Sequence, residues 1–169
     1  MKTNLITLTD PSSPIAEAYR RLRVNLIAAE KKQPLGRLLI AAAGPDDDKA
    51  TTLANLAVSF AKIGKRVVIV DCDLRHPAQH DIFNLPNIAG VTTALNVAES
   101  DLPLQATEIE NLRVMTSGPT AEAPSDLIAS PAMAELIGRL STAADFVLID
   151  VPPVVLATDA AELAVHVDG

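Results

Sequence analysis

The feature of this sequence that most constrains its fold is a series of short apolar segments that alternate with helical patterns. Four such segments, rich in Leu, Ile and Val, stand at residues 37–43, 66–70, 112–115 and 146–149. Between the first two, Leu53, Leu56, Ala57 and Phe60 form one apolar stripe at helical spacing over residues 49–62. Short strands that alternate with helices are typical of a parallel sheet. We therefore expect an α/β fold of three layers, with helices on both faces of a parallel sheet.

Further helical patterns occupy residues 13–31, 124–140 and 159–165. Ser13 is suited to cap the first of these helices, and Pro14 is suited to be its first residue. Residues 74–110 contain prolines and predict a looser region with two short helices. Residues 1–11 show no periodicity and predict an irregular segment.

The length of 169 residues predicts a single domain. Residues 1–36 would form an N-terminal helix and linker, and residues 37–169 would form the core. The sequence stops at Val167-Asp168-Gly169, where the rhythm predicts another strand. We therefore expect the core to be incomplete, with a sheet truncated at its C-terminal edge.

Charge and composition exclude some classes of partner. The formal net charge of −7 disfavours binding to nucleic acid or to anionic lipid, since both require a basic surface. No apolar run approaches the ~20 residues that span a bilayer, so direct membrane insertion is not expected. The single cysteine, Cys72, excludes an internal disulfide and is typical of a reducing cytoplasm.

Acidic residues follow two of the predicted strands. Asp71 and Asp73 come after the strand at 66–70, and Asp150 comes after the strand at 146–149. A single aspartate at a strand end is usually a turn or cap residue. Here, however, the carboxyl ends of parallel strands converge on one crevice, and carboxylates there can hold Mg²⁺ or its waters. Lys49, at the start of a helix, would point at a phosphate in the same crevice.

Five segments together resemble the bacterial tyrosine kinases of the CpsD/CapB type and the cytoplasmic domain of Wzc-like proteins. These kinases lie within the MinD/ParA branch of P-loop ATPases. Residues 14–23, PIAEAYRRLR, resemble the family's N-terminal E-x-x-R-x-x-R helix. Residues 67–77, VVIVDCDLRHP, resemble the Walker A′ segment, and residues 146–153, FVLIDVPP, resemble Walker B. Residues 117–119 and 124–128 resemble further family landmarks.

The resemblance implies a P-loop NTPase-like fold and a role for each matching residue. Asp71 would accept or orient the proton of a tyrosine hydroxyl, whereas Asp73 and Asp150 would complete the catalytic set and hold Mg²⁺. The resemblance implies ATP or ADP with Mg²⁺ as the ligand. The loop at 44–52, which includes Lys49, would hold it together with Arg75. Glu17, Arg20 and Arg23 would form the subunit interface of a ring-shaped homo-oligomer, although these arginines also fit a solvated helix face.

The phosphate-binding loop departs from the family pattern, which reads roughly Gly-Pro-Gly-Glu-Gly-Lys-Ser-Thr-Thr. The aligned residues here are Gly44, Pro45, Asp46, Asp47, Asp48, Lys49, Ala50, Thr51 and Thr52. Asp46 and Asp48 replace two glycines, whose backbone N–H groups approach phosphates closely. Ala50 removes the hydroxyl that coordinates Mg²⁺, and Thr51 lies about 100° further around the helix. An alternative is that Asp46, Asp47 and Asp48 form a cation site. A calcium loop, however, has ligands at alternating positions, which three consecutive aspartates do not provide.

The loop aspartates bring negative charge to an anion site. Two like charges ~4 Å apart repel by about 4 kcal/mol at an effective dielectric of about 20. With most of that screened, about 1–3 kcal/mol remains, which is roughly 5- to 150-fold in affinity. We therefore expect weak ATP binding and weaker chemistry.

Three functional interpretations follow. The first is a tyrosine (auto)kinase domain of capsular or exopolysaccharide biosynthesis and export, with weak activity. It would be cytoplasmic, at the inner face of the plasma membrane, through a membrane-embedded co-polymerase partner or through a missing N-terminal part. The second is a catalytically dead pseudokinase that acts as a regulatory and oligomerisation module. The third is a ParA/MinD-type positioning ATPase, which the helix at 14–23 disfavours. The one tyrosine, Tyr19, lies on an apolar helix face and is expected to pack in the core.

Overall fold

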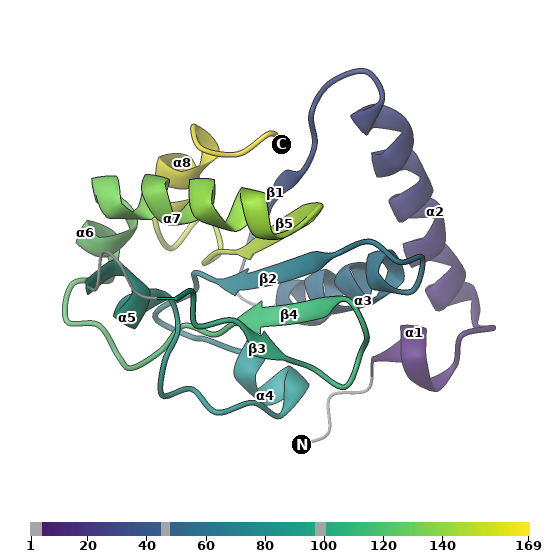
Figure 1. Ribbon diagram of the computed structural model, residues 1–169, viewed down its shortest axis with the longest axis horizontal. Helices are drawn as coiled ribbons and strands as arrows, with labels where there is room; N and C mark the ends of the chain where they lie inside the picture. Colours follow the sequence, from purple (N-terminus) through teal and green to yellow (C-terminus); the bar gives the residue numbers. More distant parts are fainter. Residues whose placement is uncertain (1–4, 45–47, 97–100) are drawn as a thin grey trace.

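The computed structural model describes residues 5–44, 48–96 and 101–169, which form one mixed α/β sheet structure (Figure 1). The strands are β1 (Arg37–Ile40), β2 (Val67–Asp71), β3 (Gln105–Ala106), β4 (Leu112–Met115) and β5 (Phe146–Asp150). The helices are α1 (Ile6–Thr9), α2 (Pro14–Glu30), α3 (Lys49–Ala61), α4 (Gln79–Phe83), α5 (Val91–Asn96), α6 (Pro124–Ile128), α7 (Pro131–Ala143) and α8 (Asp159–Ala164).

The sheet has the strand order β1-β5-β2-β4-β3. The first four of these strands are parallel, and β3 pairs with β4 in the antiparallel direction. The expected parallel sheet is therefore confirmed, with one short antiparallel strand that the sequence did not indicate. Because β2 and β5 are neighbours, their last residues, Asp71 and Asp150, lie opposite each other in register.

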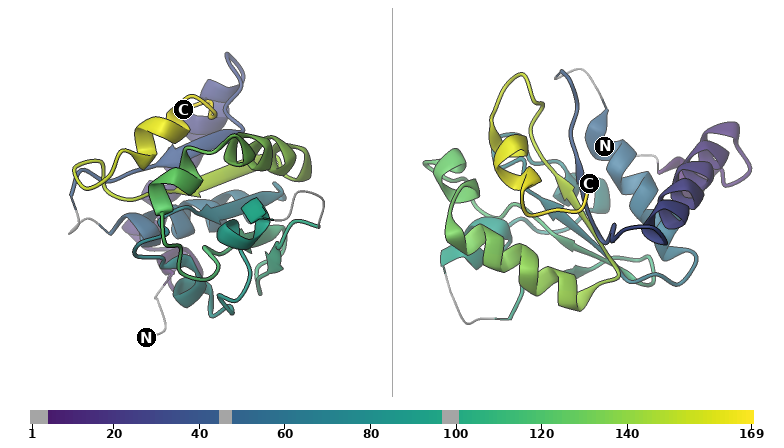
Figure 2. Two further views of the ribbon diagram at one scale, coloured as in Figure 1. Left: turned by 90° about the vertical axis from the view of Figure 1, so that its left-hand side faces the viewer. Right: turned by 90° about the horizontal axis from the view of Figure 1, so that it is seen from above.

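Helices cover both faces of the sheet, as expected (Figure 2). On one face α3 lies against the sheet with α1 and α2 outside it, and on the other face α5, α6, α7 and α8 gather. The residues of each strand alternate between these layers: Val67 and Ile69 join the core with α3, whereas Val68 and Val70 join the core with α7. The predicted stripe of α3 is buried throughout.

The N-terminal helix begins as the sequence predicts. The Ser13 hydroxyl accepts a hydrogen bond from the backbone N–H of Ala16, and Pro14 is the first helical residue. Residues 1–11 were expected to be irregular, but within the described part of that segment α1 forms one short turn. The backbone N–H and the hydroxyl of Thr7 both donate to the Asn55 side chain, which anchors α1 on α3.

Two other boundaries differ from the prediction. The helical pattern at 124–140 is divided into α6 and α7, because Pro131 has no N–H group and its ring obstructs the preceding turn, so it starts a new helix. The first strand ends at Ile40 rather than at residue 43, because from there the chain turns to the segment after β5, where the Ala42 carbonyl accepts from the Val154 N–H.

Residues 168–169 lie along the outer edge of β1. The Asp168 N–H donates to the Arg37 carbonyl, and the Leu39 N–H donates to the Gly169 carbonyl. The Arg37 guanidinium also pairs with the Asp168 carboxylate, which lowers the pKa of that carboxyl group. The division of the chain into residues 1–36 and 37–169 remains a prediction.

Candidate nucleotide-binding site

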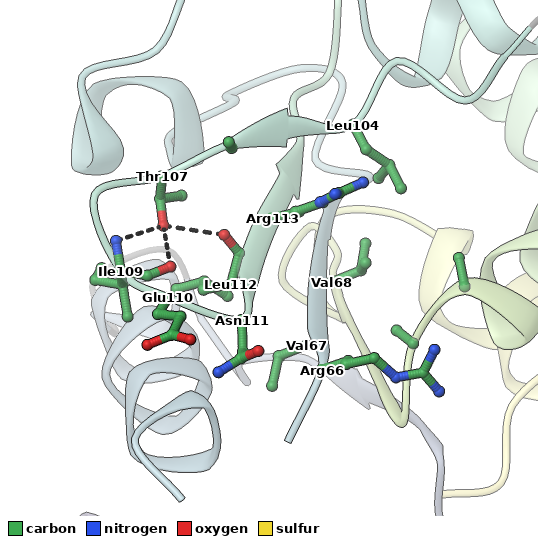
Figure 3. A pocket seen from close by; sticks show the side chains of 13 residues that line it. Arg66, Val67, Val68, Leu104, Thr107, Ile109, Glu110, Asn111, Leu112 and Arg113 are labelled. Carbon is green, nitrogen blue, oxygen red and sulfur yellow. Dashed lines mark hydrogen bonds between the residues drawn. The ribbon is translucent and has the colours of Figure 1, made fainter. Parts of the chain in front are cut away.

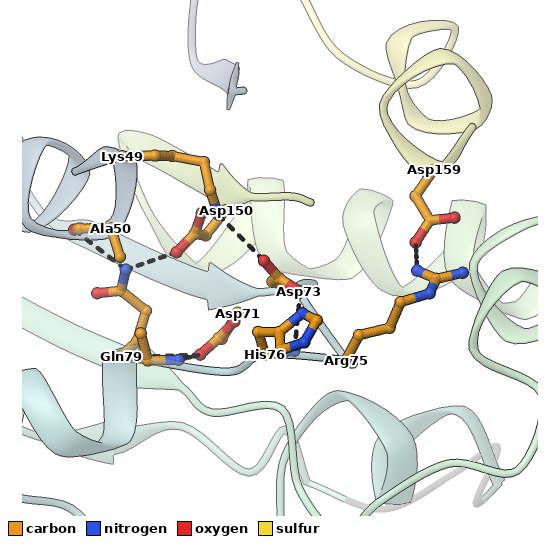
Figure 4. Close-up of polar contacts among 10 residues, drawn as sticks. Lys49, Ala50, Asp71, Asp73, Arg75, His76, Gln79, Asp150 and Asp159 are labelled. Atoms are coloured by element: carbon orange, nitrogen blue, oxygen red, sulfur yellow. Dashed lines mark hydrogen bonds and ion pairs between the residues drawn. The ribbon is translucent and has the colours of Figure 1, made fainter. Parts of the chain in front are cut away.

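Three buried aspartates meet at the carboxyl ends of β2 and β5 (Figure 4). Asp71 and Asp150 end these two strands, and Asp73 follows two residues after Asp71. The strand directions therefore explain the arrangement, since neighbouring parallel strands deliver their last side chains to one edge. The structure brings together the three residues predicted to be catalytic.

Lys49 joins this group from α3, of which it is the first residue. Its Nζ atom contacts Asp150 Oδ1 and lies 3.4 Å from Asp73 Oδ2. The lysine expected to bind phosphate thus lies against the two carboxylates expected to hold Mg²⁺. Its contact with phosphate remains a prediction, and phosphate binding would require the ammonium group to leave Asp150.

Asp71 has an unusual set of contacts for a carboxylate. Its Oδ2 atom accepts hydrogen bonds from the backbone N–H groups of Ala78 and Gln79, at 3.0 and 2.9 Å, at the start of α4. Its Oδ1 atom is buried and has no hydrogen-bond partner in the described part of the chain. Burial, and then the charge of Asp150, raise the pKa of Asp71 to about 7. A carboxylate that titrates near neutral pH is suited to accept a proton.

Asp150 is influenced by opposing effects. Burial raises the pKa of its carboxyl group, whereas the Lys49 ammonium and the Gln79 amide oppose that rise. The crevice also has more carboxylates than cations, because Lys49 is the one basic side chain that contacts Asp73 or Asp150 among the described residues. Such a surplus favours a bound divalent cation.

Gln79 is a site residue that the sequence did not indicate. Its side chain is fully buried, and its Nε2 atom donates to Asp150 Oδ2 at 2.7 Å and to the Ala50 carbonyl at 3.2 Å. A polar residue in a short helix carries no pattern that distinguishes it from a solvated one. Its burial depends on the approach of α4 to α3, which the sequence does not specify.

Arg75 was predicted to bind the nucleotide, but it points away from Lys49 and toward α8 (Figure 4). Its guanidinium pairs with the buried carboxylate of Asp159 and donates to the Ser125 hydroxyl at 2.6 Å. Asp159 also accepts from Ser125 at 3.2 Å. These contacts join the segment after β2 to the starts of α6 and α8. The sequence interpretation named Ser125 only as part of residues 124–128 and gave Asp159 no role.

Part of the predicted phosphate loop, Pro45, Asp46 and Asp47, lies outside the described residues. Asp48 precedes α3 and is exposed, without a side-chain hydrogen bond that caps the helix. The Asp48 carbonyl accepts from the Thr52 N–H, and the Thr51 carbonyl accepts from the Asn55 side chain. The first turn of α3 is therefore regular around Lys49 and Ala50.

The described residues fit a magnesium ion that a nucleotide brings with it. Asp73 and Asp150 face one cation, the Lys49 ammonium, and Mg²⁺ is commonly held by one or two carboxylates plus phosphates and water. Among residues 5–44, 48–96 and 101–169, no cluster of three or more His, Cys, Asp or Glu side chains forms a protein-only metal site. Cys72 is buried, and burial raises the pKa of its thiol well above the usual value.

The residues predicted to form the subunit interface all make contacts within the chain. Glu17 and Arg20 form an exposed ion pair of 2.6 Å, and Arg20 also donates to the Pro11 carbonyl at 2.7 Å. Arg23 donates to the Ser59 carbonyl of α3 at 2.7 Å. Tyr19 is half-buried against the core around α3, in agreement with its predicted packing role. The interface role of the charged residues remains a prediction.

A cavity of about 510 Å³ lies away from these residues (Figure 3). It is lined by the starts of β2 and β4, the segment before β4 and the end of α7. Since Asp71 and Asp150 are at the opposite ends of the strands, this cavity is separate from the candidate site.

In the part of the chain that the structure describes, no helix has the length and apolar character needed to cross a membrane.

Comparison with known proteins agrees with this geometry. A family model described as "ATPase MipZ" matches residues 39–165. Tyrosine-protein kinase YwqD of Bacillus subtilis is 39% identical over 170 residues, a match that covers 100% of this chain and 72% of YwqD. Tyrosine-protein kinase wzc of Salmonella typhimurium is 31% identical over 166 residues, which is 98% of this chain but 23% of wzc.

A solved structure shows the same arrangement of elements. The crystal structure of the chimerical protein CapA2B2 is 41% identical and superposes with a TM-score of 0.91, over 96% of this chain and 72% of the solved one. The similarity to these proteins, in sequence and in structure, thus extends over nearly the whole length of this chain. The chain belongs to the bacterial tyrosine-protein kinases, a family of MinD/ParA-type ATPases.

Proposed function

We propose that this chain is a tyrosine-kinase domain that binds Mg-ATP weakly because its phosphate loop is altered. The observation that supports this most directly is the contact of Lys49 with Asp73 and Asp150. It means that the loop lysine and the carboxylates of two strands share one crevice, as transfer of a phosphoryl group requires. The aspartates at 46–48 and Ala50 are the reason to expect weak binding.

Each residue of the crevice has a chemical role in the proposal. A bound Mg²⁺ would neutralise charge on the phosphoryl group being transferred, with Asp73 and Asp150 as its protein ligands. Lys49 would exchange its contact with Asp150 for one with the β- and γ-phosphates. Asp71 would accept the proton of the tyrosine hydroxyl, and its pKa of about 7 suits that step. Arg75 would contact the nucleotide only after release from Asp159.

Calorimetric titration with Mg-ATP tests the proposal. We expect weak binding by the native sequence and a 5- to 150-fold gain when Asp46→Gly, Asp48→Gly and Ala50→Ser are combined. A matched control carries Asp10→Gly, Asp101→Gly and Ala143→Ser, which makes the same changes at exposed positions outside the loop. The control should bind as weakly as the native chain. Micromolar or tighter binding by the native chain would contradict a weakened loop.

The same altered loop favours a second candidate, a catalytically dead pseudokinase that regulates or assembles with other subunits. Transfer of labelled phosphate from ATP to a tyrosine peptide separates the two. A slow but Lys49-dependent transfer supports the kinase. The pseudokinase is supported if the native chain transfers no phosphate and if Asp46→Gly, Asp48→Gly and Ala50→Ser, combined in the loop-repaired chain, restore transfer.

The cellular setting is part of the proposal. We place the domain at the cytoplasmic face of the plasma membrane, in capsular or exopolysaccharide biosynthesis and export, next to a membrane-embedded co-polymerase that activates it. We also propose ring-shaped self-assembly through α2. Co-purification with such a membrane protein, and its loss when the partner's cytoplasmic segments are deleted, is the expected result.

A further inference from the structure

We propose that Gln79 is a positioning residue, which fixes the orientation of the Asp150 carboxylate and connects it to Asp71 and to the first turn of α3. This inference rests on the proposed function, in which Asp150 is a ligand of Mg²⁺. Gln79 comes from a different element than any predicted site residue, and it contacts the ends of both β2 and β5.

The backbone of Gln79 is held by Asp71. The N–H groups of Gln79 and of the preceding Ala78 both donate to Asp71 Oδ2, at 2.9 and 3.0 Å. The start of α4 is therefore fixed to the last residue of β2. These two bonds therefore also fix the position of the Gln79 backbone, from which the side chain extends to Asp150.

The Gln79 amide has only one orientation that suits its neighbours. Its Nε2 group donates to Asp150 Oδ2 at 2.7 Å and to the Ala50 carbonyl at 3.2 Å, and both partners are acceptors. A flipped amide would place Oε1 against these two oxygens, which repel it. The two donor hydrogens of one buried amide thus join β5 to the turn that carries Lys49 (Figure 4).

This contact divides the two oxygens of Asp150 between different tasks. Oδ2 is held by Gln79, and Oδ1 contacts the Lys49 ammonium, on the side where Mg²⁺ would bind. Rotation of the carboxylate would break the bond to Gln79, so the amide keeps Oδ1 directed into the crevice. Groups that hold metal ligands in this way affect metal affinity without touching the metal.

The other end of the amide argues against a purely packing role. Gln79 Oε1 is buried and has no hydrogen-bond partner among the described residues, which is unfavourable in a core. A methionine has a similar length and would fill the same space without that unpaired oxygen. The two donor bonds are therefore what distinguishes glutamine at this position.

Gln79→Met in the loop-repaired background, with Asp46→Gly, Asp48→Gly and Ala50→Ser, tests the inference. We expect the affinity of the nucleotide-bound protein for Mg²⁺ to fall 10- to 100-fold, while ADP affinity measured in EDTA changes less than threefold. The control is Gln105→Met, which removes a glutamine that also donates two side-chain hydrogen bonds, but away from the crevice. Equal losses with and without Mg²⁺, or no loss in Mg²⁺ affinity, would overturn the inference.

Two measurements without nucleotide separate this inference from the proposed function. In a crystal structure of Gln79→Met, the Asp150 carboxylate should rotate away from its native orientation, and an unchanged carboxylate would overturn the inference. In the native chain, NMR should show that the Gln79 side-chain amide exchanges its hydrogens at least 10-fold more slowly than that of exposed Gln33. This holds even if Gln79→Met does not fold, and equal exchange rates would overturn the inference. Rotation of Asp150 together with no nucleotide binding by any variant would refute the proposed function alone.

Discussion

Asp71 combines a structural and a chemical role in one side chain. One of its oxygens fixes the start of α4, while the other is buried and unpaired, next to the negative charge of Asp150. Both burial and repulsion penalise its charged form, which is why its pKa is raised to about 7. The folded protein therefore retains a proton on Asp71 that the unfolded chain releases near pH 4.

This pKa predicts how stability changes with pH. Between about pH 4 and 7 the folded state binds more protons than the unfolded state, so the free energy of unfolding falls as pH rises, and it levels off above pH 7. Asp71→Asn should remove this contribution, on the order of 2 kcal/mol between pH 5 and 8. Urea unfolding in EDTA at several pH values measures it. Asp126→Asn, at an exposed carboxylate, is the control, and a native pH profile in Asp71→Asn would contradict the prediction.

The aspartates and Lys49 were predictable as one group because strand ends and a helix start place them by rule. Gln79 and Asp159 were not predictable, since each is buried by packing between elements distant in the sequence. Arg75 depends on packing between distant elements in the same way. The sequence predicted that it binds the nucleotide, but in the structure its guanidinium is directed toward the carboxylate of Asp159 on α8.

At the scale of elements, α3 carries most of the organisation around the site. Its stripe predicted burial on one side, but residues 53–61 are buried all around. The reason is that α1 and α2 cover its outer side, through contacts such as Thr7 with Asn55. Sequence periodicity identifies a helix and its inner face. It does not reveal which other helix covers the outer face.

The contact of α3 with β5 leads to a prediction about stability. The rings of Phe60 and Phe146 stack with centroids 4.2 Å apart, and both side chains are fully buried. Phe60→Ala should lower the free energy of unfolding by about 3–5 kcal/mol, since it leaves a cavity in a packed core. Phe83→Ala, at a half-buried ring, is the comparison and should cost clearly less. Equal losses in urea unfolding would show that the stack has no special weight.

At the scale of the whole molecule, α2 has one side on the core and one side in solvent. Tyr19 and Leu26 pack toward α3, whereas Ile15 and Leu22 are 58% and 41% exposed. Ile15 and Leu22 are seven residues apart, close to two full turns, so they lie in one line along α2, at the solvent-exposed edge of the side that carries Tyr19 and Leu26. Helical spacing puts Ile15 and Leu22 in one stripe with Tyr19 and Leu26, yet in the structure both are exposed, because the main contacts of α2 are with α1 and α3.

This exposed face changes how self-assembly through α2 is best tested. Arg20→Ala with Arg23→Ala should reduce oligomer size, but Arg23 also bonds to the Ser59 carbonyl, so that pair of changes loosens α2 from α3 as well. Ile15→Ser with Leu22→Ser alters only solvent-facing side chains. If the face is buried between subunits, losing about 1.5 kcal/mol or more of apolar burial should weaken association at least 10-fold. Sedimentation velocity over a range of concentrations measures it.

The control for this experiment removes apolar surface elsewhere. Ile88→Ser with Val165→Ser changes two side chains that are more exposed than those on α2 and lie outside it. General stickiness of apolar surface would make the control weaken association as much as the α2 variant does. A specific interface requires that only the α2 variant dissociates, with unchanged thermal stability. If neither variant changes the sedimentation profile, assembly does not use this helix, and the charged residues of α2 are accounted for by their contacts within the chain.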